Sequence, residues 1–88
     1  MLVKLVEIYK HPGERVKLDE IFVSKEAVTS IRPEKGSIIN EAIEFGISEH
    51  AGFSRLTLNE GGMARTVIVV GTPTEVRNKL GIRRVLRG

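Results

Sequence analysis

The sequence feature that most constrains the fold is an unbroken run of four β-branched residues, Val67-Ile68-Val69-Val70. Such residues fit the pleated surface of a sheet, and a continuous apolar run is typical of a strand that is buried on both faces. The run completes a segment that begins at Met63 and is followed by Gly71. The sequence therefore predicts a strand over 63–70 in the interior of a sheet.

A short helix is predicted directly after this strand. Thr72 has a side chain suited to cap a helix N-terminus, Pro73 fits the first helical position, and Glu75 completes a capping box with Thr72. Gly81 is suited to the left-handed conformation that ends many helices. The predicted helix therefore spans about 73–80.

The N-terminal third of the chain is predicted to form three strands. Two segments rich in strand-forming residues, 2–9 and 16–23, flank the turn signal Pro12-Gly13. They predict a hairpin with a longer loop. The segment 27–31 predicts a third strand, which Pro33 ends because proline lacks the N–H that a ladder needs.

The segment 34–52 allows two interpretations. At about 100° per residue, the apolar residues of 38–48 gather on one half of a helix, with Ser37 placed to cap it. Residues 42–48 also alternate between apolar and polar side chains, as a strand does. The helix is favoured because the whole of 38–48 fits it, whereas Glu41 interrupts the longer strand pattern.

A further strand and a tight turn precede the interior strand. Leu56 and Leu58 alternate with polar residues over 53–59, and 59–62 ends in two glycines that suit a tight turn. This order of elements predicts an α+β fold with a small antiparallel sheet of about five strands and one or two short helices. The 88 residues are expected to form a single domain over 1–88, with a basic C-terminal end at 76–88.

The composition excludes several classes of protein. The absence of cysteine rules out disulfides and thiolate zinc sites and fits a reducing compartment. No apolar stretch approaches the roughly 20 residues that cross a bilayer. The first residues also lack the apolar core of a signal peptide. We therefore expect a cytoplasmic protein with no membrane contact.

No catalytic or metal-binding constellation is recognisable in the sequence. His11 and His50 lie far apart, whereas a metal site needs at least three convergent ligands. Glu41, Glu44 and Glu49 are interpreted as the solvated face of the predicted helix. We expect a protein that is not an enzyme, that has no cofactor and that has no evident small-molecule site.

Charge is distributed unevenly along the chain. The formal net charge is +3, yet no acidic residue follows Glu75. The basic residues beyond it could contact phosphates, complement the dipole of their own helix, or pack against an acidic face of a sister subunit. The lack of aromatic residues among them argues against binding to single-stranded nucleic acid. These candidate partner or phosphate contacts are Arg77, Lys79, Arg83, Arg84 and Arg87.

Several spaced segments together suggest a family. They are a strand at 21–23, the stretch Ala27-Val28-Thr29-Ser30-Ile31-Arg32-Pro33, a strand at 54–59 before Gly61-Gly62, and a strand at 66–70 before the helix with Glu75-Val76. In these segments the chain resembles the flagellar FlbD family and similar small uncharacterised phage proteins, from which it differs in its long segment 34–52. The resemblance implies a small β-rich binding or regulatory protein of a kind that phages encode, and it assigns no catalytic residue.

The sequence therefore favours a small non-enzymatic binding or regulatory protein that acts through a protein surface. We expect a homo-oligomer, because a short chain that is poor in aromatic residues and lacks disulfides has a modest core. We expect a protein partner rather than nucleic acid. Two alternatives stay open: a nucleic-acid-binding module that uses the basic C-terminal end, and a small structural or assembly protein of a virion.

Overall fold

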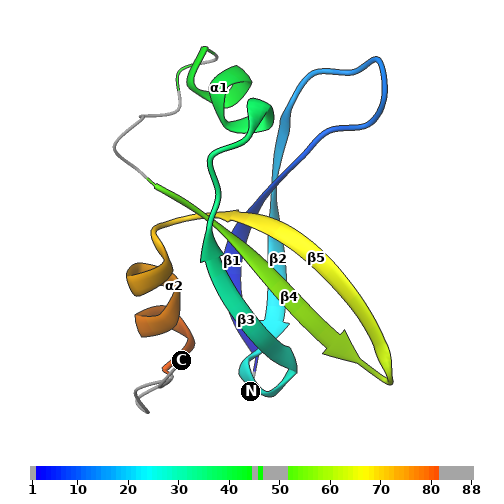
Figure 1. Ribbon diagram of the computed structural model, residues 1–88, viewed down its shortest axis with the longest axis vertical. Coiled ribbons are helices and arrows are strands. Elements are labelled where there is room, and N and C mark those ends of the chain that lie inside the picture. Colours follow the sequence, from blue (N-terminus) through cyan, green and yellow to red (C-terminus); the bar gives the residue numbers. More distant parts are fainter. Residues whose placement is uncertain (1, 45, 47–51, 82–88) are drawn as a thin grey trace.

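The fold is a five-stranded antiparallel sheet with two short helices, which confirms the predicted α+β class. A computed structural model of the chain describes residues 2–44, 46 and 52–81. The strands lie in the order β2-β1-β5-β4-β3, and every neighbouring pair is antiparallel (Figure 1). The elements are β1 (Leu2–Tyr9), β2 (Lys17–Ser24), the 3-10 turn η1 (Lys25–Ala27), β3 (Val28–Pro33), α1 (Ser37–Glu44), β4 (Phe53–Glu60), β5 (Met63–Val70) and α2 (Pro73–Leu80).

Strand β5 is an interior strand, as its sequence predicts. It lies between β1 and β4 in the sheet. Val67 and Val69 are buried on one face, whereas Ile68 and Val70 are partly buried and pack on the other. The continuous β-branched run therefore serves two separate apolar clusters, one on each side of the sheet.

The larger cluster lies on the inner face of the curved sheet, beneath α2. This cluster consists of buried side chains from four adjacent strands, β2, β1, β5 and β4, and of two side chains from α2. Its buried members are Leu5, Val23, Leu56, Leu58, Val67, Val69, Val76 and Leu80. The smaller cluster lies on the opposite face beneath α1, and its buried members are Ile8, Ile39, Ala42 and Phe53.

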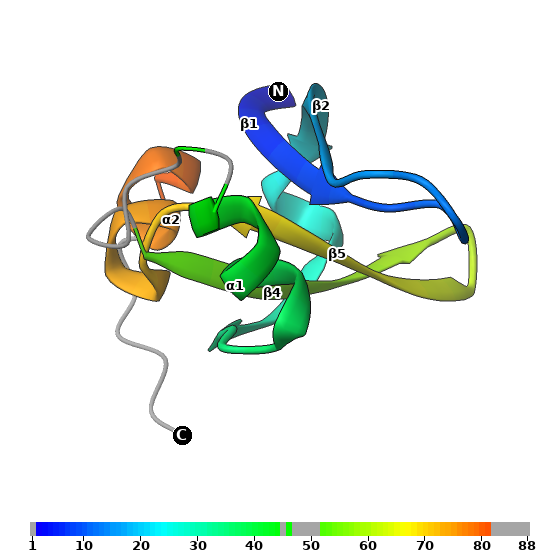
Figure 2. The same cartoon turned by 90° about the horizontal axis from the view of Figure 1, so that it is seen from above.

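The sheet is narrowest where its two halves meet. Strand β1 pairs with β5 at Glu7 with Val69 and at Ile8 with Ile68, whereas β1 and β2 pair along their full length. Beyond this junction the β1–β2 hairpin diverges from the β4–β5 hairpin (Figure 2). The hairpin therefore projects as an arm whose inner side contributes Leu5 and Val23 to the larger cluster and whose outer side is accessible.

Helix α2 begins and ends where the sequence predicts. The Thr72 hydroxyl accepts a hydrogen bond from the Glu75 N–H, and the Glu75 carboxylate accepts one from the Thr72 N–H. Gly81 ends the helix in the left-handed conformation, with φ 73°. These local contacts fix α2 directly after β5, because its caps satisfy backbone groups that the helix itself leaves free.

Helix α1 confirms the helical interpretation of the ambiguous segment over part of its length. It spans Ser37–Glu44, and of the rest of the predicted range only Gly46 is described; residues 45 and 47–51 lie outside the described part of the chain. The helix includes Ser37 as its first residue, so the prediction that Ser37 precedes and caps it is wrong. The Ile39 N–H instead donates to the carbonyl of Gly36, 3.1 Å away.

Glu41 is not the solvated side chain that the sequence suggested. Its carboxylate accepts hydrogen bonds from Lys10 Nζ and from the Val16 N–H, both at 2.8 Å. Lys10 and Val16 lie in the loop between β1 and β2, so Glu41 ties this loop to α1. The hydrogen bond from Lys10, followed by that from Val16, lowers the pKa of Glu41. Glu44, by contrast, is exposed.

Replacing Glu41 with glutamine should therefore destabilise the protein in a pH-dependent way. A carboxylate whose pKa is lowered by folding contributes stability above its unfolded pKa, and that contribution disappears as the pH falls through the folded value. We expect Glu41→Gln to melt below the wild type at pH 7, with the difference shrinking as the pH falls below about 4.3, the ordinary glutamate pKa, and disappearing at still lower pH. Thermal unfolding at several pH values measures this. Glu44→Gln is the matched control, and an unchanged difference in acid would contradict the assignment.

Candidate functional site

The outer face of the β1–β2 hairpin is unusually apolar for a surface exposed to solvent. In the β1–β2 register Val6 lies opposite Glu20 and Lys4 lies opposite Phe22, so these side chains share one face. Leu18 and Leu2 extend the same alternation on either side. Leu2, Phe22, Leu18 and Val6 are 62%, 58%, 47% and 36% exposed. We call the six residues Leu2, Lys4, Val6, Leu18, Glu20 and Phe22 the hairpin face.

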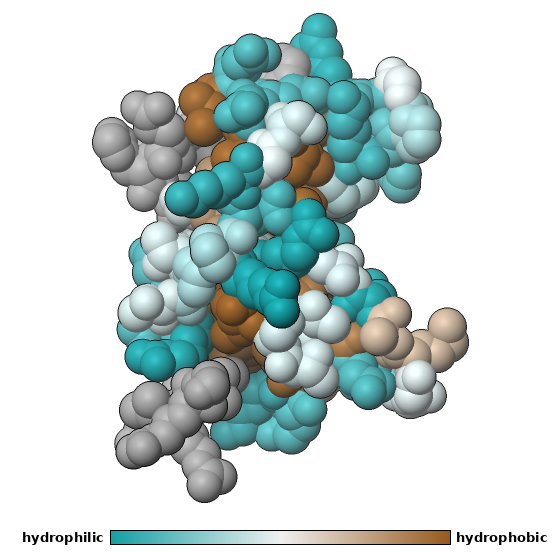
Figure 3. All heavy atoms as spheres, viewed as in Figure 1, coloured by the Kyte–Doolittle hydropathy of each residue, from teal (hydrophilic) through white to brown (hydrophobic). Residues whose placement is uncertain are grey.

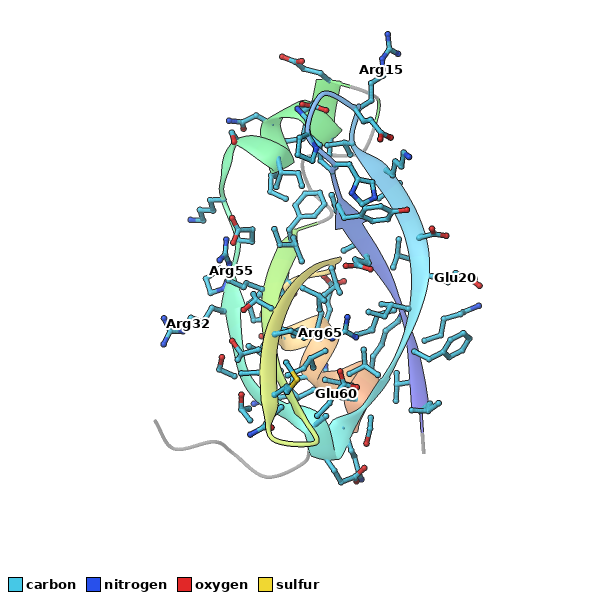
Figure 4. The ribbon with its side chains drawn as sticks, turned by 90° about the vertical axis from the view of Figure 1, so that its right-hand side faces the viewer. Arg15, Glu20, Arg32, Arg55, Glu60 and Arg65 are labelled. Atoms are coloured by element: carbon cyan, nitrogen blue, oxygen red, sulfur yellow. The ribbon has the colours of Figure 1, made fainter. Side chains whose placement is uncertain are left out.

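One ion pair crosses the hairpin face. Lys4 Nζ lies 3.3 Å from Glu20 Oε2, and both side chains are largely exposed. Glu20 points away from the body of the protein on the β2 side (Figure 4). The hairpin face thus carries one positive and one negative charge among four apolar side chains, and its net charge is zero.

The hairpin also ends the sheet. Strand β2 is the outermost strand next to β1, and within the described residues no other strand pairs with its free edge. An edge strand presents backbone N–H and C=O groups that can accept another strand. The apolar hairpin face and an open backbone edge therefore lie side by side on the same strand.

The side of the molecule that faces the viewer in Figure 3 is more hydrophilic than the hairpin face. Hydrophilic side chains cover most of the view in Figure 3, and its hydrophobic areas are divided by them. The tip of the β4–β5 hairpin projects at the lower right of this view, and at its start Met63 is 76% exposed. This is a single exposed side chain rather than a face, since the neighbouring residues of β5, from Ala64 to Thr66, are not large apolar ones.

The structure does not bring together the two predicted basic contacts that it describes. Arg77 lines a small hollow with Ile31 and Thr74, whereas Lys79 lines a different one beside Gly71. Residues two apart on a helix do not face each other. The Nε atom of Arg77 is buried and has no hydrogen-bond partner among the described residues. The remaining predicted contacts, Arg83, Arg84 and Arg87, lie outside the described residues.

A groove of about 330 Å³ separates the start of α1 from the N-terminus of α2. Ile39 and Phe53 contribute apolar surface, and Glu34 lies in its lining. The Glu34 carboxylate is 10% exposed and accepts hydrogen bonds from Arg55 Nε at 2.7 Å and from the Gly36 N–H at 3.0 Å. The bond from Arg55 is the main cause that lowers the pKa of Glu34. This carboxylate is thus already engaged by the protein itself.

The buried polar side chain of the core also has a structural partner. Ser54 is fully buried, and its hydroxyl donates to the carbonyl of Gly71 at 2.7 Å. Among residues 2–44, 46 and 52–81, no three histidine or acidic side chains gather closely enough to hold a metal ion. His11 is exposed beside Tyr9, and His50 lies outside these residues. In the same part of the chain, neither helix has the length or apolar character needed to span a membrane.

The fold and the site together define a small α+β protein whose exposed apolar surface lies on an edge hairpin. Comparison with protein-family models, with curated proteins and with solved structures finds no match to this chain.

The sequence analysis did not identify the hairpin face, although the sequence contains a signal for it. Leu18 and Phe22 alternate with the partly or fully buried Ile21 and Val23, so both sides of the strand carry apolar residues.

Proposed function

We propose that this chain is a small non-enzymatic binding protein of the cytoplasm that acts through the hairpin face and assembles with a second copy of itself. The observation that carries the proposal is the gathering of Leu2, Val6, Leu18 and Phe22 on one exposed face. Contiguous apolar surface on a soluble protein is a typical feature of interaction sites. Phe22 is the natural anchor, because aromatic residues are enriched at the centres of interfaces.

Two features favour a second copy as the partner. The hairpin face carries the opposite charges of Lys4 and Glu20, so two such faces do not repel each other. A two-fold axis can place Lys4 of each copy near Glu20 of the other, since an isologous contact uses the same patch on both subunits. The free edge of β2 adds a backbone site at the same position.

The proposal predicts assembly that depends on the hairpin face. Specific assembly is expected at protein concentrations on the order of tens of micromolar. Under these conditions light scattering should give a mass well above the 9.8 kDa of one chain. The double variant Leu18→Thr/Phe22→Ser should shift the protein to monomer, because it removes two exposed apolar anchors without touching the buried clusters. Strand-compatible residues at both positions keep the hairpin intact.

Met63→Ser is the matched control. Met63 is the most exposed large apolar residue among those described, yet it lies on β5 away from the hairpin face. We expect this variant to assemble like the wild type. A wild type that is monomeric at these concentrations, or an equal loss of assembly in the control, would reject the proposed interface.

A further inference from the structure

A second polar cluster lies on the outer face of the other half of the sheet, away from the hairpin face. In the register of β3, β4 and β5, Arg32 is directly opposite Arg55, and the next pair on this face is Ser30 with Thr57. Thr57 is in turn opposite Thr66 of β5. Directly opposite residues have Cβ atoms about 5 Å apart. Two guanidinium groups therefore adjoin a row of three hydroxyl groups.

Arg32 and Arg55 project toward the same side of the view in Figure 4, whereas Glu20, on the β1–β2 half of the curved sheet, projects toward the other. Like charges directly opposite each other destabilise a sheet. The Glu34 carboxylate relieves only part of this repulsion, because its oxygens are engaged by Arg55 Nε and by the Gly36 N–H. Within the described residues, Arg32 has no hydrogen-bond or ion-pair partner for its guanidinium.

Several hydrogen-bond donors of this cluster have no partner among the described residues. Glu34 holds Arg55 through Nε, which leaves the terminal nitrogens of that guanidinium without a partner among the described residues. The side-chain hydroxyls of Ser30, Thr57 and Thr66 also form no hydrogen bond in that part of the chain. Guanidinium groups and hydroxyls are the donors with which proteins bind phosphate oxygens.

We propose that Arg32, Arg55, Ser30 and Thr57 form a binding site for a phosphate group, as inorganic phosphate or as a phosphate monoester. A phosphate presents its oxygens in several directions, so it can accept from two guanidinium groups and an adjacent hydroxyl at once. It also removes the repulsion between the arginines. A nucleic-acid backbone is the less favoured source of the phosphate, because the exposed side chains of this face include no aromatic ring for base stacking.

The test follows backbone amide resonances while inorganic phosphate is added at pH 7 and constant ionic strength. We expect saturable shifts at Ser30, Arg32, Arg55 and Thr57, and no such shifts with chloride or acetate. Arg32→Gln should weaken phosphate binding roughly ten- to a hundredfold, the range expected for losing one charge-assisted hydrogen bond. Arg65→Gln is the matched control, because Arg65 is a strand arginine that pairs with Glu60, away from this cluster. We expect it to bind like the wild type.

Thermal unfolding gives a second readout. Without phosphate, Arg32→Gln should melt at or slightly above the wild-type temperature, because it removes the like-charge pair. Phosphate should raise the melting temperature of the wild type and not that of this variant. Equal weakening in Arg65→Gln, shifts spread over all basic residues, or a variant that melts lower without phosphate would overturn the assignment. So would tight binding of a short oligonucleotide with no response to inorganic phosphate. Assembly through the hairpin face is measured separately, so either proposal can fail alone.

Discussion

Replacing Leu56 with alanine should lower the free energy of unfolding by about 2–5 kcal/mol, the range for large-to-small substitutions in a core. Leu56 is fully buried in the middle of β4. It lies opposite Ile31 on one side and Val67 on the other, and it belongs to the cluster that α2 covers. Strands on both sides hold the site open, so the cavity cannot collapse readily.

Urea denaturation at a fixed protein concentration measures this effect, since any assembly makes stability depend on concentration. Met63→Ala is the control, because Met63 is 76% exposed and should change the stability by no more than about 0.5 kcal/mol. A loss below about 1 kcal/mol for Leu56→Ala would show that the sheet is not packed around this position.

Gly52→Ala should destabilise the protein by about 2–4 kcal/mol, through backbone strain combined with a steric clash. Gly52 has φ +70°, a conformation that other residues adopt at a cost. A Cβ atom there would overlap the Thr72 Cγ2 atom and would lie 3.2 Å from the Thr72 backbone nitrogen. The two segments are held together by the hydrogen bond from the Gly71 N–H to the Gly52 carbonyl, at 2.9 Å.

Two further variants separate the strain from the clash. Gly13 has φ +78° with nothing within 4 Å of its would-be Cβ, so Gly13→Ala should cost only the strain, about 1 kcal/mol. In the Gly52→Ala background, Thr72→Ser removes the methyl group and keeps the capping hydroxyl, so it should restore part of the lost stability. Equal losses for Gly52→Ala and Gly13→Ala would show that Thr72 does not limit the space at Gly52.

The features that the sequence predicted well are those set by neighbouring residues. Strand β5 follows from four consecutive β-branched residues, and α2 follows from a capping box and a C-terminal glycine that lie within ten positions. In each case the signal and the structure share the same short segment. The tertiary packing of β5 and α2 agrees with these local preferences. Such agreement between local sequence and global fold is typical of well-defined elements.

The features that sequence reasoning missed depend on contacts between distant segments. Glu41 has the spacing of a solvated helix residue, yet its partners Lys10 and Val16 lie in a loop far along the chain. The direction in which the hairpin faces is equally hidden, because apolar residues such as Leu18 and Val23 occupy both sides of β2. Alternation identifies the two faces of a strand but not which of them meets the core.

The candidate site was harder still to predict. The sequence favoured the basic C-terminal end as the candidate site because of its high positive charge, but its two described members, Arg77 and Lys79, line different hollows beside α2. The pairing of Arg32 with Arg55 appears only once the β3–β4 register is known, and a bulge between Val28 and Ser30 shifts that register by one residue. Extending the register of the Val28–Leu58 pair along the strands would therefore place Arg32 on the wrong face.

The narrow junction between β1 and β5 affects both the order in which the sheet forms and the way in which it can misassemble. Each hairpin closes a short loop. The pairs Glu7–Val69 and Ile8–Ile68 instead join strands that are distant in the sequence. Forming this contact therefore costs the most conformational entropy. We expect it to form last and to open first, releasing the β1–β2 arm as one cooperative unit. An arm that detaches whole can dock onto the β5 strand of another copy, which is the exchange that defines domain swapping.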